Sequence, residues 1–150
     1  MINEVWVSSN KIQYQNIGKA KIQGLEASFH KPLHPHLAWD LNYTYLDAVN
    51  ANTEERLFNR ARHKVSSQWT YNPDAPWKLH LWMDAYINYH YQPNAYAITD
   101  KTYITWNINF ERELSKNHSL LIGIENIFNH QDDSLNFPGT LFQVGYKVKL

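Results

Sequence analysis

The stretch Trp77-Lys78-Leu79-His80-Leu81-Trp82-Met83-Asp84-Ala85-Tyr86-Ile87-Asn88-Tyr89-His90-Tyr91 alternates in character with a period of two residues. Its odd positions hold aromatic residues at the ends and aliphatic residues between them, whereas its even positions are polar apart from two aromatics. A period of two predicts a β-strand, because successive side chains point to opposite faces. The alternation runs well beyond the usual strand length of about 5–6 residues. It fits a strand that crosses a bilayer, which needs about 9–11 residues and carries aromatic side chains at both interfaces.

The same alternation recurs along the chain and predicts eight strands in all. The other seven are expected at Ile2–Val7, Ile12–His30, Leu37–Leu46, His63–Tyr71, Thr102–Glu111, Ser119–Phe128 and Thr140–Leu150. The period fails near Gly24, where we expect a β-bulge or a departure from the sheet. The predicted fold class is therefore all-β: an antiparallel meander of about eight long strands that forms a transmembrane β-barrel segment.

The connections between the predicted strands alternate in length. Short connections rich in Pro, Asn and Asp follow the second, fourth and sixth strands, and longer ones cover residues 47–62, 91–101 and 129–139. Outer-membrane barrels have short periplasmic turns and longer extracellular loops. We therefore expect the three long connections to be extracellular and the C-terminus to be periplasmic.

Composition excludes several classes of protein. The 14 basic and 14 acidic residues leave no electrostatic footprint for nucleic acid, and the absence of cysteine removes disulfides and thiolate metal sites. The chain has no run of about 18 apolar residues, which a transmembrane helix needs. A mean hydropathy of −0.58 is still compatible with a barrel, whose lumen-facing half is polar. Because Ile2–Val7 already alternates, with no export signal before it, we expect the chain to be the C-terminal portion of a longer protein.

Two other architectures fit eight alternating strands. A soluble up-and-down barrel would bury the apolar faces, but repeated Trp, Tyr and Leu side chains would overfill a small barrel interior. A complete eight-stranded outer-membrane barrel, with a structural, adhesive or small enzymatic role, would suit 150 residues. In that case residues 2–7 would pair with residues 140–150, whereas a fragment would leave both outer strands unpaired.

Several motifs in a fixed order resemble one protein family. The stretch Asn16-Ile17-Gly18-Lys19-Ala20-Lys21-Ile22-Gln23-Gly24-Leu25-Glu26 resembles a strand of TonB-dependent outer-membrane receptors. Further matches to that family follow at Leu41–Ala48, Arg56–Lys64 and Glu125–Asn129, and the alternation at the C-terminal end completes the set. Each motif alone is weakly specific, but the ordered set spans nearly the whole chain.

The resemblance implies the last eight strands of a 22-stranded barrel, with a plug domain and earlier strands outside residues 1–150. The resemblance also implies a ligand-gated importer of ferric siderophores, haem or cobalamin that is driven by TonB. We therefore expect no enzyme activity and no cofactor. The implied partners are a ferric siderophore or similar ligand, the plug domain, TonB, the lipid bilayer and lipopolysaccharide. The implied location is the outer membrane of a Gram-negative bacterium. The chain departs from the family pattern at Leu150, where Phe or Trp is usual, and at Ala61, where Pro is common.

Two groups of candidate site residues follow. Arg56, Arg60, Arg62 and His63 form a basic cluster with Lys64, and arginine holds anionic oxygen ligands such as catecholates through charge-assisted hydrogen bonds. A solvated loop or a site for lipopolysaccharide phosphates is the other interpretation. In the last strand the alternating residues resemble the signal read by the outer-membrane assembly machinery; they are Phe142, Val144, Tyr146, Val148 and Leu150.

The eight histidines do not predict a metal site. His34 and His36 flank Pro35 with no third ligand nearby, and their spacing differs from the helical zinc pair. His80 and His90 share a predicted face, but ten residues of strand separate them by about 33 Å. The lumen-facing carboxylates, Asp40 and Asp84 among them, have no nucleophile–base pair beside them, so catalysis is not expected.

Overall fold

The computed structural model describes residues 2–8, 11–16, 18–94, 97–132 and 139–149. All the regular structure of these residues is β-strand. The strands are β1 (Ile2–Ser8), β2 (Lys11–Asn16), β3 (Ala20–His34), β4 (Leu37–Asn50), β5 (Arg60–Tyr71), β6 (Trp77–Asn94), β7 (Ala97–Ser115), β8 (His118–Glu125) and β9 (Leu141–Val148). No helix with the length and hydropathy for a membrane crossing occurs in these described ranges.

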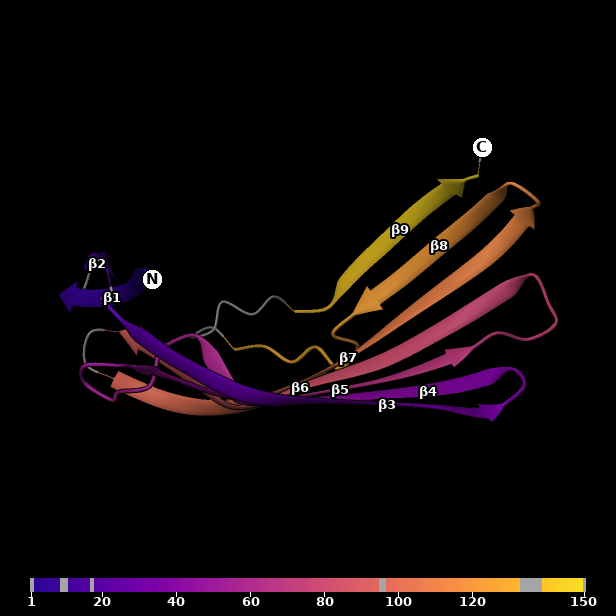
Figure 1. The fold of residues 1–150 in the computed structure, drawn as a ribbon. Helices are drawn as coiled ribbons and strands as arrows, with labels where there is room; N and C mark the ends of the chain where they lie inside the picture. Colours follow the sequence, from indigo (N-terminus) through magenta and orange to yellow (C-terminus); the bar gives the residue numbers. More distant parts are fainter. Residues whose placement is uncertain (1, 9–10, 17, 95–96, 133–138, 150) are drawn as a thin grey trace. The chain divides into compact units, whose positions relative to one another are not determined.

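The strands form two sheets. β1 and β2 pair as an antiparallel hairpin, and β3 to β9 lie side by side in chain order as a seven-stranded meander (Figure 1). Among the described strands, β3 and β9 are the edges of the larger sheet, and neither pairs with β1. The pairing of first and last strands that a complete eight-stranded barrel requires is therefore not found in the described residues. The prediction of an all-β antiparallel meander is confirmed.

The predicted second strand, Ile12–His30, is wrong as a single element. The chain leaves the sheet at Gly18 and Lys19, so that β2 pairs only with β1 and β3 begins at Ala20. Strand β3 then continues through Gly24 to His34 without a break. A Cβ on Gly24 would lie 2.3 Å from the carbonyl oxygen of Tyr45, so glycine allows the backbone of β4 to approach closely.

Strands β4 to β7 are longer than predicted, whereas β8 ends at Glu125, before the predicted Phe128, and β9 covers only Leu141–Val148 of the predicted Thr140–Leu150. β4 continues to Asn50, β5 begins at Arg60, and β6 and β7 together cover all the described residues of the predicted loop 91–101. Polar side chains do not stop a ladder, because its hydrogen bonds come from the backbone. The 19 residues of β7 are more than the about 9–11 residues that a strand needs to cross a bilayer.

The described residues group into two compact units. Unit 1 comprises residues 1–27, 43–64 and 86–103, and unit 2 comprises residues 28–42, 65–85 and 104–150. Strands β3 to β7 each contribute residues to both units. The basic cluster that the sequence singles out lies in unit 1, and the strand β9 lies in unit 2.

Strand register in unit 2 separates an apolar face from a polar face. Directly paired residues share a face, and the pairings place Phe110, Ile122 and Val144 in one row across three strands. The neighbouring row on the opposite face is Asn109, Gly123 and Gln143. The two-residue period that predicts opposed faces is therefore present in the three-dimensional pairing of these strands.

Aromatic rings cover the apolar face of unit 2. Trp69 of β5 stacks on Trp106 of β7 with ring centroids 5.8 Å apart, and Trp77 contacts both Tyr71 and Phe110. The Trp39 indole N–H donates to Ser67 Oγ over 2.8 Å, which satisfies its polar atom on this face.

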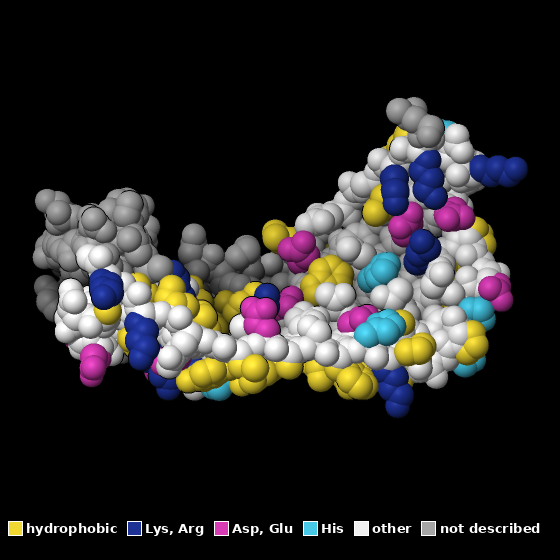
Figure 2. Space-filling model, viewed as in Figure 1, with side chains coloured by type: hydrophobic (Ala, Val, Ile, Leu, Met, Phe, Trp, Pro, Cys, Tyr) yellow, Lys and Arg dark blue, Asp and Glu magenta, His cyan; other side chains and the backbone are white. Residues whose placement is uncertain are grey.

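The sheet has almost no apolar core of its own. Among the residues whose burial is described, the buried hydrophobic side chains are Ala48, Leu57, Ala85 and Tyr91, and no large side chain is fully buried. Phe142 and Val144 are 76% and 78% exposed. Figure 2 shows hydrophobic side chains gathered along one side of the strands. A soluble barrel would have turned these side chains inward, so the apolar face needs a covering that the described residues do not provide.

Candidate functional site

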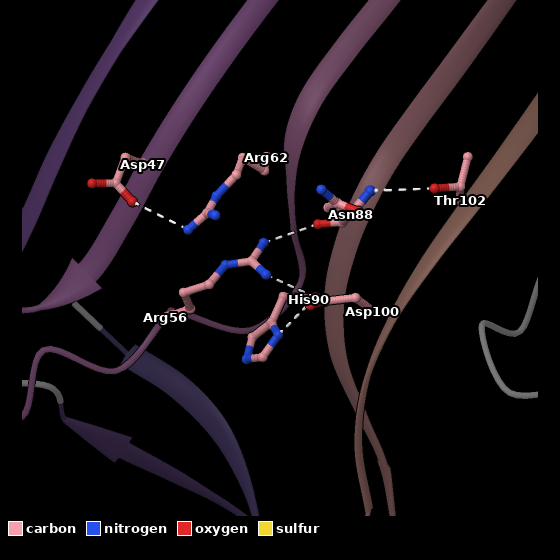
Figure 3. A network of polar contacts seen from close by, with 7 residues as sticks. All are labelled: Asp47, Arg56, Arg62, Asn88, His90, Asp100 and Thr102. Atoms are coloured by element: carbon pink, nitrogen blue, oxygen red, sulfur yellow. Dashed lines mark hydrogen bonds and ion pairs between the residues drawn. The ribbon is translucent and has the colours of Figure 1, made fainter.

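Arg56 connects the segment before β5 to both strands of the β6–β7 hairpin (Figure 3). Its Nη1 donates to Asp100 Oδ1 over 2.8 Å, and its Nη2 donates to the carbonyl oxygen of Asn88 over 2.9 Å. The Arg56 side chain is 22% exposed and that of Asp100 is 46% exposed, so water partly screens their charge-assisted hydrogen bond. We call Arg56, Asn88, His90 and Asp100 the Arg56 network.

His90 is held on two sides within this network. Its Nδ1–H donates to Asp100 Oδ1 over 2.9 Å, and its ring stacks on Phe58 with centroids 5.1 Å apart and planes 7° apart. The backbone N–H of Asn59 donates to the His90 carbonyl oxygen over 2.7 Å. The segment 56–59 is therefore fixed to β6 by backbone, ring and charge contacts together.

Asp100 is the acidic centre of the network, within the segment 91–101 that the sequence predicts to be extracellular. Partial burial raises its pKa, but the hydrogen bond from His90 and the charge of Arg56 outweigh burial. The pKa of Asp100 therefore lies below its ordinary value of 3.8, and the carboxylate is ionised at neutral pH.

The other predicted ligand residues lie in separate contacts. Arg60 donates from Nη1 to the carbonyl oxygens of Phe58 and Asn59. Arg62 Nη2 lies 3.8 Å from Asp47 Oδ1, and its buried Nε has no hydrogen-bond partner among the residues that the structure describes. The structure thus brings Arg56, Arg60 and Arg62 into unit 1 but gives each a different partner.

His63, the fourth predicted ligand residue, contacts two tyrosines of β4. Its Nδ1 shares a hydrogen bond of 2.8 Å with the Tyr43 hydroxyl, and its ring lies against those of Tyr43 and Tyr45. These contacts fix the imidazole against β4. A role for these four residues in ligand binding stays a prediction.

Tyrosines of the β6–β7 hairpin form a cluster that the sequence analysis missed. Tyr86 stacks on Tyr103 at 4.8 Å between centroids, and Tyr89 meets the same ring edge-on at 5.7 Å. Strict alternation predicts Tyr86 and Tyr89 on opposite faces, and this expectation is wrong because Asn88 adopts a left-handed φ of 54°. Asparagine tolerates that conformation, so the signal available in the sequence was Asn88 within a strand.

The remaining histidines and acids make pairwise contacts. His30 Nδ1 lies 2.6 Å from Asp40 Oδ1, and His80 Nδ1 shares a hydrogen bond of 3.2 Å with Thr70. The rings of His34 and His36 lie 5.4 Å apart, and His36 Nε2 is 3.5 Å from Asp74 Oδ2. Within the described ranges, no three His, Cys, Asp or Glu side chains are grouped so as to hold a metal ion.

The C-terminal strand presents its alternating residues at the edge of the sheet. Phe142, Val144, Tyr146 and Val148 lie on β9 and are all exposed, and Leu150 lies outside the described residues. The Tyr146 hydroxyl shares a hydrogen bond of 2.7 Å with His118 Nδ1 of β8. A role in recognition by the assembly machinery stays a prediction.

A meander sheet with one aromatic, exposed face, one polar face and almost no apolar core among the described residues has the construction of a transmembrane β-barrel wall. The chain belongs to the TonB-dependent receptor-like β-barrel family, whose family model matches residues 3–127. The sequence is 26% identical over 160 residues to the ferric enterobactin receptor PirA of Pseudomonas aeruginosa, covering 97% of this chain and 20% of that receptor.

Three solved structures share the fold. The siderophore receptor PirA of Acinetobacter baumannii matches with a TM-score of 0.74 at 19% identity, covering 98% of this chain and 26% of that one. The ferric enterobactin receptor PfeA of Pseudomonas aeruginosa matches with 0.74 at 22% identity, covering 91% and 23%. The copper transporter OprC matches with 0.71 at 15% identity, covering 99% and 26%. The chain thus spans about a fifth of the curated relative and about a quarter of the solved chains.

Proposed function

We propose that this chain is the C-terminal part of an outer-membrane receptor for a ferric siderophore. Membership of the TonB-dependent receptor family across residues 3–127 carries the proposal. The names of its relatives, which include ferric enterobactin and siderophore receptors, support the ligand class. The exposed aromatic face supports contact with lipid, since charged groups are costly on a lipid-facing surface and aromatic rings are favoured at its borders.

The whole receptor carries the parts that uptake needs beyond these strands. In this proposal the barrel has 22 strands, the plug domain fills its lumen, and TonB drives import. The C-terminus is periplasmic, and the lipid bilayer and lipopolysaccharide surround the wall. Sequencing the DNA upstream of the Met1 codon tests this part. Several hundred in-frame codons that encode a plug domain are expected, and a stop codon directly upstream would contradict it.

Ligand binding involves the basic residues Arg56, Arg60, Arg62 and His63 in this proposal. The hydrogen bonds of Arg56, at 2.8 and 2.9 Å, are shorter than the 3.2 Å bond of Arg60 to Asn59 and the 3.8 Å ion pair of Arg62, so Arg60 and Arg62 are the better candidates for direct contact. Replacing Arg60 by Ala in the whole receptor is expected to weaken ferric siderophore binding about tenfold, the effect of one charge-assisted hydrogen bond.

A binding titration with purified receptor measures this loss. Arg112→Ala, which removes an exposed arginine of β7 in unit 2, is the matched control and should bind as the unaltered receptor does. Equal affinity in Arg60→Ala would remove Arg60 from the site. Binding of cobalamin or haem in place of any ferric siderophore would replace the proposed ligand class.

A further inference from the structure

Arg112 is a cation on the apolar face of unit 2. The strand pairings place Arg112 of β7, Leu120 of β8 and Tyr146 of β9 in one row. Directly paired residues share a face, and so do alternate residues of one strand, so Arg112 lies on the same face as Phe110. The Arg112 side chain is exposed. A charged group on this face requires an explanation, because charge is costly in contact with hydrocarbon.

The aromatic residues of unit 2 indicate how deep Arg112 lies. Trp77 contacts Tyr71 and Phe110 with ring centroids 5.5 and 6.0 Å apart, and aromatic rings are enriched at the borders of a bilayer. Arg112 follows Phe110 by two residues, about 7 Å along the strand, in the direction of the turn at residues 116–117. Arg112 therefore lies beyond the aromatic border, at the level of lipid headgroups, where a cation costs little free energy.

The two rows on the other side of Arg112, away from the turn, are entirely apolar. They continue the same face of β7, β8 and β9, and neither contains a charged or polar side chain. Phe110, Ile122 and Val144 form the nearer row, and Ile108, Ile124 and Phe142 form the next. A polar headgroup beside Arg112 would therefore have its acyl chains against these two rows.

Arg112 differs from the nearest cation of the opposite face in having no anionic partner. Lys147 follows Tyr146 on β9, and its Nζ lies 3.7 Å from Glu111 Oε1. Within the part of the chain that the structure describes, the Arg112 side chain makes no ion pair or hydrogen bond. Its guanidinium can therefore bind an anion from outside the chain through charge-assisted hydrogen bonds.

Tyr146 supplies a second polar group to the same row. Its hydroxyl shares a hydrogen bond of 2.7 Å with His118 Nδ1, and the two rings stack with centroids 5.7 Å apart. When His118 Nδ1–H is the donor, the phenol keeps its own hydrogen for another acceptor. Two strand spacings separate Arg112 from Tyr146, about 10 Å across Leu120. A phosphate group over Leu120 can accept hydrogen bonds from both sides.

We propose that Arg112 and Tyr146 form a site for the phosphate group of an anionic phospholipid. This inference rests on the proposed function, which puts the turn at residues 116–117 in the periplasm, and it adds a lipid site on the outside of the barrel wall. The guanidinium binds the phosphate oxygens, and the acyl chains lie along the apolar rows. A zwitterionic headgroup binds less tightly, because its ammonium group is repelled by Arg112.

Lipid titrations of the purified whole receptor in detergent, followed by native mass spectrometry, test this site. Phosphatidylglycerol is the anionic probe, and phosphatidylethanolamine is the zwitterionic one. Arg112→Gln removes the charge, and Tyr146→Phe removes only the hydroxyl, so it decides the matter if Arg112→Gln does not fold. Lys147→Gln is the matched control, because it removes a cation from the neighbouring position on the opposite face.

Phosphatidylglycerol is expected to bind the unaltered receptor about fivefold more tightly than phosphatidylethanolamine. Arg112→Gln should remove this difference, and Tyr146→Phe should weaken phosphatidylglycerol binding about threefold, the effect of one lost hydrogen bond. Lys147→Gln should bind both lipids as the unaltered receptor does. An excess of inorganic phosphate should displace none of the lipid, because the acyl chains contribute to binding.

Three results would overturn the inference. Equal phosphatidylglycerol affinity in Arg112→Gln, Tyr146→Phe and Lys147→Gln would move lipid binding elsewhere on the wall. Displacement of the lipid by inorganic phosphate would make the site one for free anions. Tighter binding of the lipid A of lipopolysaccharide, lost in Arg112→Gln, would assign this end of the strands to the outer leaflet.

A ferric siderophore titration of the same proteins separates the inference from the proposed function. Siderophore binding should be unchanged in Arg112→Gln. A receptor that binds a ferric siderophore but shows no dependence of lipid binding on Arg112 would overturn the inference alone. A receptor that keeps this dependence but binds no ferric siderophore would overturn the proposed ligand class and leave the lipid site in place.

Discussion

Arg56 donates a hydrogen bond of 2.8 Å to Asp100, which lies 44 residues further along the chain. The contact joins the segment between β4 and β5 to the N-terminal end of β7. A second bond from the same guanidinium to the Asn88 carbonyl oxygen reaches β6. One arginine therefore ties three parts of unit 1 together and holds the segment that leads directly to Arg60.

Breaking this contact is expected to loosen segment 56–59. With Arg56→Gln in the whole receptor, the amide of Asn59, which donates to His90, should exchange hydrogen about fivefold faster. That factor corresponds to about 1 kcal/mol, a modest value because the Asp100 side chain is 46% exposed. Hydrogen exchange followed by mass spectrometry measures it. Lys116→Gln in the turn after β7 is the control, and equal exchange in Arg56→Gln and the control would contradict the role of the network.

The Arg56 network is expected to weaken in acid. The pKa of Asp100 in the folded chain lies below its ordinary value of 3.8. Its contribution is therefore fully present above pH 3.8 and lost as the pH falls through the lower, folded value. Exchange of the Asn59 amide, corrected for intrinsic chemistry, should rise in that acid range. Asp100→Asn should lack this acid step, and an identical step in both proteins would assign it to another group.

Gly24 is expected to tolerate no side chain. An added Cβ would lie 2.3 Å from the Tyr45 carbonyl oxygen, so Gly24→Ala forces β3 and β4 apart and should cost about 1–3 kcal/mol. Gly18→Ala is the matched control, because a Cβ there meets nothing within 4 Å. Urea unfolding of the whole receptor compares the two. If the midpoint of Gly24→Ala matched that of Gly18→Ala, the close approach of the strands would be wrong.

Asn88 is expected to resist β-branched replacements. Asn88→Val places a branched side chain at a φ of 54° and should cost about 1–2 kcal/mol, whereas Asn88→Gly should stay within about 0.5 kcal/mol. Asn42→Val on β4 serves as a control at a position with ordinary φ. The unfolding midpoints in urea report these differences. A valine variant as stable as the glycine variant would show that the left-handed residue is not required.

Much of the fold can be predicted from the period of the side chains. Trp77, Trp106 and Phe110 lie on one aromatic face as their alternation predicts, and the turn at residues 72–76 separates β5 from β6 where Pro73 and Pro76 predict it. These predictions succeed because they depend on local properties of the sequence. The two-residue alternation assigns side chains to faces, and proline ends a strand because it lacks an N–H to donate.

The parts that sequence reasoning missed depend on contacts between distant residues. β2 separates from β3 at Gly18 because β2 pairs with β1. No local sequence pattern predicts that pairing. The basic cluster that contains Arg56 can be predicted from charge alone. Its partners Asp100 and Asn88 cannot, because they lie on strands that strand pairing brings close to Arg56. The left-handed Asn88 also breaks the period on which the face assignments rest.

The central claim is that lipid covers the apolar face of the strands. Ile122 lies in the row with Phe110 and Val144, and Asn109 lies in the row of the opposite face. In the receptor folded into lipid vesicles, Ile122→Lys should lower the free energy of unfolding by about 2–4 kcal/mol, the cost of a cation in hydrocarbon, and Asn109→Lys by less than about 1 kcal/mol. An equal loss in the two variants, or a larger loss in Asn109→Lys, would contradict the account.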